Sequence, residues 1–410
     1  MEAGWGRAEF SVATPVPLAG YATWRERVSD RVRDPLFCRA IALRDGGLPV
    51  VLVAYDLLLV SDALSVAVRA RLADTGARVV VHATHTHSSM GGFWDSFLCR
   101  RFMGQPRAWA LPRLVDAGER AARQAIASLA PAEPRSASVL VPGLNGNRRD
   151  PAGPRDEELT VLRLVRESDE AIVASYPAHP VIVAERDFHA VSADFPGEVV
   201  ARLERDCAFA MYVQGSLGGV DVLFPEDRGV TADRNIELMS APLANAALHL
   251  ARGAGPGPAS LGFAEVEIAL PRPDPRPYFD DQWQRKVDLP LRLLFRSLLG
   301  GVPRRARVAG FRVGDFAFVG TPSDLGVSIG LAIKAAARAA GVANPVAASQ
   351  TDGYIGYLHR RDDYRRAPPP GGPHLGMARY ENAMGFFGRD GGERVLDAAR
   401  EVIGRLQPML

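Results

Sequence analysis

Three histidines, His82, His85 and His87, lie within six residues of one another in a chain that has 8 in all. In an extended strand, residues two apart point to the same face, so His85 and His87 would project side by side. Imidazole is a common zinc ligand, and a pair of imidazoles at a strand end would suit a metal centre. A pair of hydrogen-bonded surface histidines is the alternative, and the spacing by itself leaves both interpretations open.

A fourth histidine, His179, follows an apolar segment and is flanked by Pro177 and Pro180. Proline restricts the local backbone, which suits a ligand that must be held rigidly, although a histidine satisfied in a turn would look the same. Asp194 could cap the helix that follows it, or it could orient a ligating imidazole. His189 lies in a polar loop, and we assign it no chemical role.

Acidic and phenolic side chains could complete such a centre. Ser323 is a suitable N-cap for a helix through Ala340, which places Asp324 in the first turn, where the helix dipole favours a carboxylate without any functional role. Tyrosines are dense in the Gly-rich stretch 352–358, and another follows at Tyr380. They are either packing aromatics or weak ligands and oxyanion donors.

The elements that must position these residues follow from apolar patterning and turn signals. We predict strands over Phe37–Leu43, Val50–Tyr55, Val79–Val81, Ala137–Val141, Leu159–Val165, Ala171–Tyr176, Phe209–Val213, Phe263–Ala269, Val308–Phe318 and Pro345–Ala348. We predict helices after the Ser61 cap through Leu72 and over Leu114–Leu129, Gly197–Arg205, Ala232–Ala251, Asp281–Leu299 and Glu393–Leu406, and a loop over Ala367–Pro373. The mixed order indicates an α/β or α+β core with helices flanking mixed sheets, and no linker divides it.

Composition narrows the classes of function. The formal net charge is +2 with the two signs mixed, so neither a nucleic-acid nor a membrane partner is expected. The 3 cysteines have no paired spacing, which argues against a disulfide scaffold. We see no signal peptide, and the longest apolar run, Leu48–Val60, is too short for a transmembrane segment. We therefore expect a cytoplasmic protein.

The segment Ala83-Thr84-His85-Thr86-His87-Ser88, followed by Gly91-Gly92, resembles the THTHSGPGG signature of the neutral, non-lysosomal ceramidase family. Further segments resemble motifs of that family in the same order along the chain. They are Leu18-Ala19-Gly20-Tyr21-Ala22, Arg39-Ala40, Asp56, Asn147-Arg148, Ala178-His179-Pro180, Ser192-Ala193-Asp194, Val213-Gln214, Gly356-Tyr357-Leu358, Asp363-Tyr364 and Arg379-Tyr380-Glu381.

The resemblance implies the fold of the family's catalytic domain and one zinc ion. It assigns the zinc ligands to His85, His179, Asp324 and Tyr357. It also implies that activated water cleaves an amide bond, with residues around the scissile bond at His87, Arg148 and Tyr380. In this interpretation His87 transfers protons, and Arg148 with Tyr380 holds the developing oxyanion.

The chain departs from the family pattern at three places. Asp324 stands where the family has Glu, and Asp221 stands where it has an active-site Ser. We therefore expect an N-acyl amine or N-acyl amino compound other than ceramide as the small-molecule substrate, with Asp221 among the catalytic residues. The family's C-terminal immunoglobulin-like domain is not recognised, so residues 1–410 are expected to form a single catalytic domain.

Two other functions remain open from the sequence. The same zinc site could serve biosynthetic acyl transfer or cyclisation, which activated acyl donors would reveal. The chain could instead be a non-catalytic descendant that binds a lipid or a partner protein, in which case the centre would hold no metal. The oligomeric state is not predicted.

Overall fold

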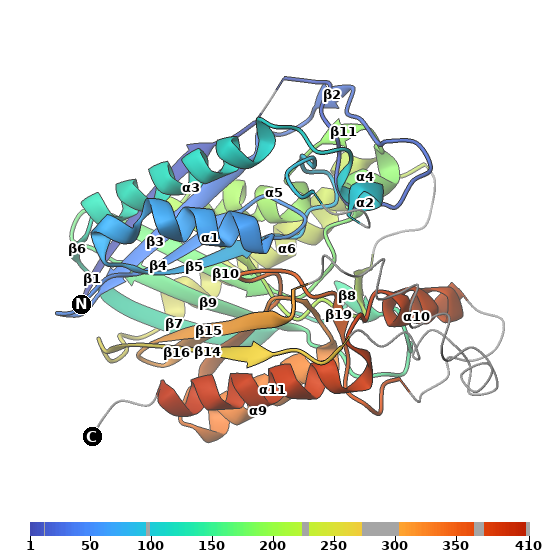
Figure 1. The fold of residues 1–410 in the computed structure, drawn as a ribbon. Coiled ribbons are helices and arrows are strands. Elements are labelled where there is room, and N and C mark those ends of the chain that lie inside the picture. Colours follow the sequence, from blue (N-terminus) through green and yellow to red (C-terminus); the bar gives the residue numbers. More distant parts are fainter. Residues whose placement is uncertain (12, 96–98, 224–228, 273–302, 365–372, 407–410) are drawn as a thin grey trace.

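The computed structural model describes residues 1–410 except 12, 96–98, 224–228, 273–302, 365–372 and 407–410. Three main sheets lie at the centre of the molecule, and helices cover their outer faces (Figure 1). This arrangement confirms the predicted class of mixed sheets flanked by helices. The helix predicted over 281–299 lies outside the described residues, as does most of the loop predicted over 367–373.

The first sheet has the order β5-β4-β3-β1-β6 and consists of β1 (Glu2–Glu9), β3 (Phe37–Arg44), β4 (Val50–Tyr55), β5 (Arg78–Ala83) and β6 (Ala130–Pro131). Helix α1 (Asp62–Arg71) connects the parallel strands β4 and β5. The Ser61 hydroxyl accepts a hydrogen bond from the Leu64 N–H at 3.2 Å, which confirms the predicted N-cap. Together with α3 (Ala110–Ala127), α1 covers the outer face of this sheet (Figure 1).

The second sheet has the order β12-β10-β9-β7 and consists of β7 (Glu133–Leu140), β9 (Glu158–Val165), β10 (Glu170–Tyr176) and β12 (Phe209–Gln214). Helices α5 (Asp194–Leu203) and α6 (Ala232–Gly253) pack on its outer face. The predicted strand pair at 159–176 is antiparallel, as its short connection requires.

The third sheet has the order β14-β15-β16-β18 and consists of β14 (Leu261–Ala269), β15 (Arg305–Val313), β16 (Phe316–Gly320) and β18 (Asn344–Ala348). Helices α9 (Val327–Ala339) and α11 (Gly388–Arg405) cover it. The prediction of one strand over 308–318 was wrong. Gly314 adopts φ +54° and turns the chain back, so this segment is a hairpin of β15 and β16.

The inner faces of the three sheets share one apolar core. Its large side chains include Ile41, Leu52, Leu162, Val173, Met211, Val213, Phe311, Phe318 and Val346. Each sheet thus buries both of its faces, one against the other sheets and one against helices, and this explains why β4, β12, β16 and β18 are buried along their whole length. The ends of these rigid strands provide fixed points for a site.

Short elements connect the sheets. Two-stranded pairs form between β2 (Arg31–Val32) and β11 (Ala190–Val191), β8 (Asn145–Asn147) and β13 (Val220–Val222), and β17 (Asp324–Leu325) and β19 (Tyr357–Leu358). Short helices are η1 (Ala73–Thr75), α2 (Arg100–Met103) and α4 (Ile182–Arg186), and α10 (Pro373–Ala383) precedes α11. The pairs β8–β13 and β17–β19 carry Asp221, Asp324 and Tyr357, and Arg148 directly follows β8.

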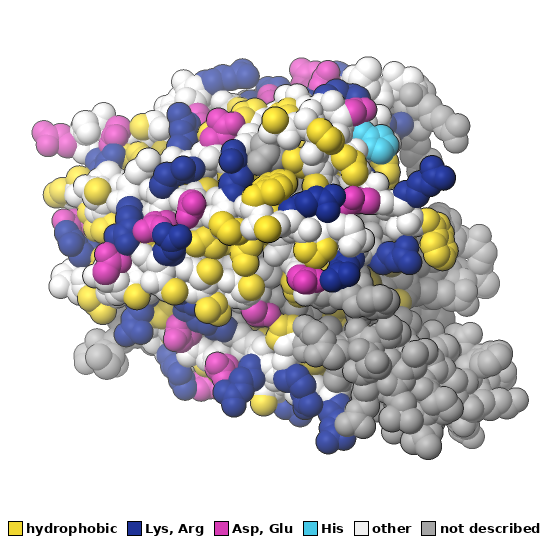
Figure 2. Space-filling model, turned by 45° about the horizontal axis from the view of Figure 1, so that its top comes forward, with side chains coloured by type: hydrophobic (Ala, Val, Ile, Leu, Met, Phe, Trp, Pro, Cys, Tyr) yellow, Lys and Arg dark blue, Asp and Glu magenta, His cyan; other side chains and the backbone are white. Residues whose placement is uncertain are grey.

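Basic and acidic side chains are interspersed over the face shown in Figure 2. Many of them form exposed ion pairs, such as those of Arg71 with Asp116 and Glu119. Exposed pairs of this kind add little stability, so the fold rests on its apolar core. Within the described residues, no helix has the length and apolar character needed to cross a membrane.

Candidate active site

The loop after β5 brings His85 and His87 together, but not by strand geometry. The strand ends at Ala83, and His85 adopts φ +69°, in the left-handed region. The two histidines are neighbours as predicted, but the predicted cause, alternation along a strand, was wrong. The two Nε2 atoms lie 3.3 Å apart because the loop is tied by hydrogen bonds from the backbone N–H of His85 to the Leu57 carbonyl and from that of His87 to the Pro180 carbonyl.

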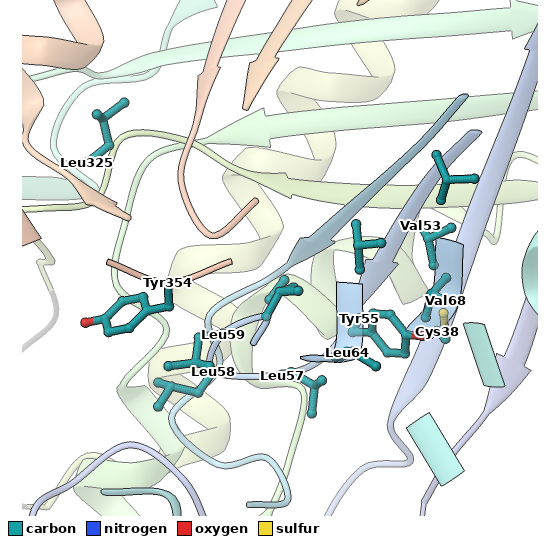
Figure 3. Close-up of a cluster of buried hydrophobic side chains, with 14 of the residues drawn as sticks. Cys38, Val53, Tyr55, Leu57, Leu58, Leu59, Leu64, Val68, Leu325 and Tyr354 are labelled. Atoms are coloured by element: carbon teal, nitrogen blue, oxygen red, sulfur yellow. The ribbon is translucent and has the colours of Figure 1, made fainter. Parts of the chain in front are cut away.

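Buried leucines support this loop. Leu57, Leu58 and Leu59 follow β4 and belong to the same buried cluster as Tyr354 (Figure 3). The carbonyl of Leu58 accepts a hydrogen bond from His85 Nδ1 at 2.6 Å. Because Nδ1 donates, Nε2 carries the free lone pair, and the ring is oriented as a metal ligand would need.

His179 lies opposite, at the end of β10. Its Nδ1 donates to the Val220 carbonyl at 2.7 Å, and its Nε2 lies 3.2 Å from the Tyr357 hydroxyl. The His85 and His179 rings have centroids 4.9 Å apart, and ligand atoms of His85, His87 and His179 all lie within 4.8 Å of one another. Three imidazoles from two distant segments therefore face one small volume.

Burial lowers the pKa of each of these histidines. The pKa of His85 falls to about 3, and those of His87 and His179 fall well below the usual value, with the positive charge of Arg148 adding to the effect in all three. All three rings are neutral near pH 7, which is the form that binds a metal.

Asp324 completes the centre from the third sheet's side. It lies in β17, paired with Tyr357 in β19, and not in the first turn of a helix as predicted, because α9 begins only at Val327. Its Oδ1 is 3.5 Å from His85 Nε2. The Tyr354 hydroxyl donates to Oδ2 at 2.7 Å, and Gln350 Nε2 donates to Oδ1. Burial raises the pKa of this carboxyl to about 7 despite these bonds.

These donor atoms have spacings that fit a metal ion. Tetrahedral zinc with ligands at about 2.0–2.1 Å places neighbouring donors about 3.3 Å apart. The pairs His85–His87, His85–Asp324 and His179–Tyr357 are separated by 3.3, 3.5 and 3.2 Å. Nitrogen and oxygen donors of these types are also the set that zinc accepts.

Arg148 follows β8 and reaches into the same volume. Its Nη2 donates to the Tyr357 hydroxyl at 2.9 Å and lies 3.3 Å from His179 Nε2. Asp221 lies on its other side, with Oδ2 3.7 Å from Nη1, and the side chain of Asp221 is 32% exposed. The aromatic ring of Tyr380, on α10, lies 5.9 Å from that of Tyr357, and the residue is 42% exposed. Arg148 is thus the buried member of this group, and Asp221 and Tyr380 are its more open members.

Other candidates have structural roles. Asp194 does not orient an imidazole, because its oxygens accept hydrogen bonds from the backbone N–H groups of Val183 and Phe195 at 2.8 and 2.7 Å. His82 is fully buried, and its Nε2 accepts a hydrogen bond from the Gln214 N–H at 2.9 Å. His189 donates to the Val28 carbonyl near the surface.

Sequence reasoning gave no specific role to four polar residues around the centre. Gln350 and Tyr354 hold Asp324, and Arg149 and Glu381 form a buried ion pair behind Arg148. Glu381 stands next to the predicted Tyr380, so its position was a usable signal. Nothing in the sequence connected Gln350 with a carboxylate 26 residues before it.

Comparison with known proteins identifies the family of this chain. The sequence model of the neutral/alkaline non-lysosomal ceramidase N-terminal domain matches residues 3–220, about half of the chain. Among curated protein sequences, no relative was found.

Solved structures share the fold. A ceramidase complexed with C2 matches with a TM-score of 0.81 and 18% identity, over 98% of this chain and 74% of its own. A neutral ceramidase from Pseudomonas aeruginosa matches with a TM-score of 0.79 and 19% identity, over 100% of this chain and 75% of its own. With the family match across the first half of the sequence and the same fold throughout, this chain belongs to the neutral/alkaline non-lysosomal ceramidase family.

Proposed function

We propose that this protein is a zinc-dependent amidohydrolase that cleaves the amide bond of an N-acyl amine. The observation that carries the proposal is the cluster of His85, His87 and His179, whose ligand atoms all lie within 4.8 Å of one another. Asp324 approaches His85 at 3.5 Å, and the Tyr357 hydroxyl lies 3.2 Å from His179, so both can add oxygen ligands. A zinc ion bound there would polarise the amide carbonyl and lower the pKa of water to about 7.

His87 is the candidate for proton transfer. Its Nε2 is directed at the centre, 3.3 Å from His85 Nε2. In that place it can accept a proton from attacking water and return it to the leaving nitrogen. Because His87 also lies within ligand distance, we assign it the proton-transfer role on the resemblance and leave the four other residues as ligands.

Arg148 and Tyr380 are the candidates for stabilising the oxyanion. The Arg148 guanidinium is buried and held on two sides, so its N–H groups are fixed before substrate arrives. Fixed donors stabilise a developing charge without reorganisation, and this is the largest single contribution in many enzymes. Asp221, the partly exposed neighbour of Arg148, is then the residue that we expect to contact the polar part of the substrate.

Metal analysis of purified variants tests the proposal. We expect about one zinc per chain in the unaltered protein, a large loss in His85→Ala and His179→Ala, and normal content in His189→Ala, whose ring donates to the Val28 carbonyl near the surface. Full zinc content in both ligand variants would refute the site. Incubation with N-hexanoyl p-nitroanilide, with and without a competing amine, then separates hydrolysis from acyl transfer by the products formed.

A further inference from the structure

The carboxylate of Glu381 is a heavily bonded acidic group near the site, and the proposed chemistry assigns it no role. It is 0% exposed. Its Oε1 accepts from Arg148 Nε at 2.7 Å and from the Gly219 N–H at 3.1 Å. Its Oε2 accepts from Arg149 Nη1 at 3.0 Å and lies 3.1 Å from His359 Nε2. One carboxylate therefore faces four donor groups from three segments of the chain, which match its acceptor sites.

This carboxylate determines where Arg148 points. A guanidinium is planar, so holding Nε at one acceptor fixes the direction of the outer nitrogens. With Nε on Glu381, Nη2 reaches the Tyr357 hydroxyl at 2.9 Å and Nη1 is left 3.7 Å from Asp221. Among the described residues, Asp221 is the other acidic group that pairs with Arg148, so without Glu381 the guanidinium could turn toward it.

Charge balance leads to the same conclusion. Arg148 and Arg149 are consecutive and both largely buried, and such a pair of cations needs a buried anion. Burial raises the pKa of Glu381, but Arg148, His359 and Arg149 together lower it well below its usual range, so it is ionised. The ion pairs also dock α10, which carries Tyr380 next to Glu381.

We propose that Glu381 is a positioning residue of this active site, which orients Arg148 toward the reacting amide and, by docking α10, places Tyr380 beside Tyr357. The inference rests on the proposed hydrolase function, because Arg148 is its oxyanion donor. Glu381 itself contacts neither substrate nor metal.

A double-mutant cycle between Glu381→Gln and Arg148→Met tests the inference, with N-hexanoyl p-nitroanilide as substrate. We expect Glu381→Gln to lower kcat about 10- to 100-fold, as the loss of a charged hydrogen bond does, and to change KM less than about threefold. Its zinc content should stay normal. The double variant should be no slower than Arg148→Met alone, because both changes remove the same oriented donor.

Glu204 provides a matched control. Its carboxylate also bridges two arginines, Arg7 at 2.9 Å and Arg39 at 2.6 Å, but it touches none of the site residues. Glu204→Gln should therefore keep kcat, both in the unaltered protein and when it is added to Arg148→Met. Independent, multiplying losses for Glu381 would overturn the inference.

Two further measurements keep the test decisive. Glu381→Asp retains the charge and withdraws the carboxylate by one methylene, so it should fold and still lose kcat; full kcat in this variant would overturn the inference.

The coupling between Glu381→Gln and Arg148→Met can also be measured as free energies of unfolding in urea, which needs no turnover. Absence of turnover by the unaltered chain contradicts the proposed function only, whereas the absence of Glu381–Arg148 coupling in unfolding contradicts the positioning role.

Discussion

Oδ1 of Asp324 lies 3.5 Å from Nε2 of His85, although His85 lies in the loop after β5 and Asp324 lies in β17, in opposite halves of the chain. Both partners are held by other groups: His85 by the Leu58 carbonyl, and Asp324 by Tyr354 and Gln350. A carboxylate and an imidazole fixed in this way, each with an orienting hydrogen bond behind it, form the arrangement that tunes metal sites.

Asp324→Asn should therefore weaken zinc binding while leaving the fold in place. The amide keeps the shape of the carboxylate but loses its charge, and we expect an affinity loss of at least about 10- to 100-fold. Competition with a chromogenic chelator measures it. Asp352→Asn is the control, since Asp352 pairs with Arg69 and Arg307 away from the centre and should cost stability without releasing zinc. Equal zinc affinity in the Asp324 variant would remove this residue from the ligand set.

Gly20→Ala should disable the site through His87. Gly20 adopts φ +124°, and a Cβ there would lie 2.9 Å from Cβ and Nδ1 of His87. Backbone strain of this kind costs about 1–3 kcal/mol, and the clash would also displace the imidazole. Gly46→Ala is the matched control, because Gly46 has φ +68° but open space around it. We expect both variants to lose stability in thermal unfolding, and only Gly20→Ala to lose activity; an active Gly20→Ala enzyme would contradict the role of His87.

Tyr380→Phe should slow the reaction without weakening substrate binding. If its hydroxyl donates to the oxyanion, its loss should reduce kcat by about 10²–10³-fold with little change in KM. Steady-state kinetics on the nitroanilide checks this expectation. Tyr364→Phe is the comparison, because Tyr364 packs on His359 and not on Tyr357. Were the two variants equally active, Tyr380 would have no catalytic part.

His82 should make the protein less stable in mild acid. Burial lowers its pKa to about 3 in the folded chain, whereas the unfolded value is about 6.5. Between these values the unfolded state binds a proton that the folded state does not, so stability falls as pH drops below about 6.5. From pH ~6.5 to ~5, His82 alone should cost about 2 kcal/mol.

Urea unfolding of the unaltered protein and of His82→Gln over this range measures the contribution of His82 as a difference in slope. Taking a difference is necessary because Asp56, Asp194 and Asp324 have raised pKa values and act in the opposite direction. His189→Gln serves as the control and should keep the slope of the unaltered protein. An unchanged slope in His82→Gln would show that this histidine is not held neutral.

The sequence alone determined the element types and the loops that carry the imidazoles. Apolar runs bounded by turn residues identified β3, β4 and α1 almost to the residue and the central part of β5, since these patterns depend on local preference and burial. The histidine loop and the Tyr357 and Tyr380 segments were likewise recognised by motif. Single-domain organisation over 1–410 and the absence of a C-terminal immunoglobulin-like domain stay predictions.

Only the tertiary structure decided how these segments meet. Two contacts join residues far apart in the chain: Asp324 pairs with Tyr357 across β17 and β19, and the Glu381 carboxylate lies behind Arg148. The left-handed turn at His85 was likewise not visible in the sequence. Such contacts have no local signature, because each depends on how three sheets pack against one another through a shared core. Residue type and order therefore indicated the chemistry, whereas long-range packing fixed which side chains can perform it.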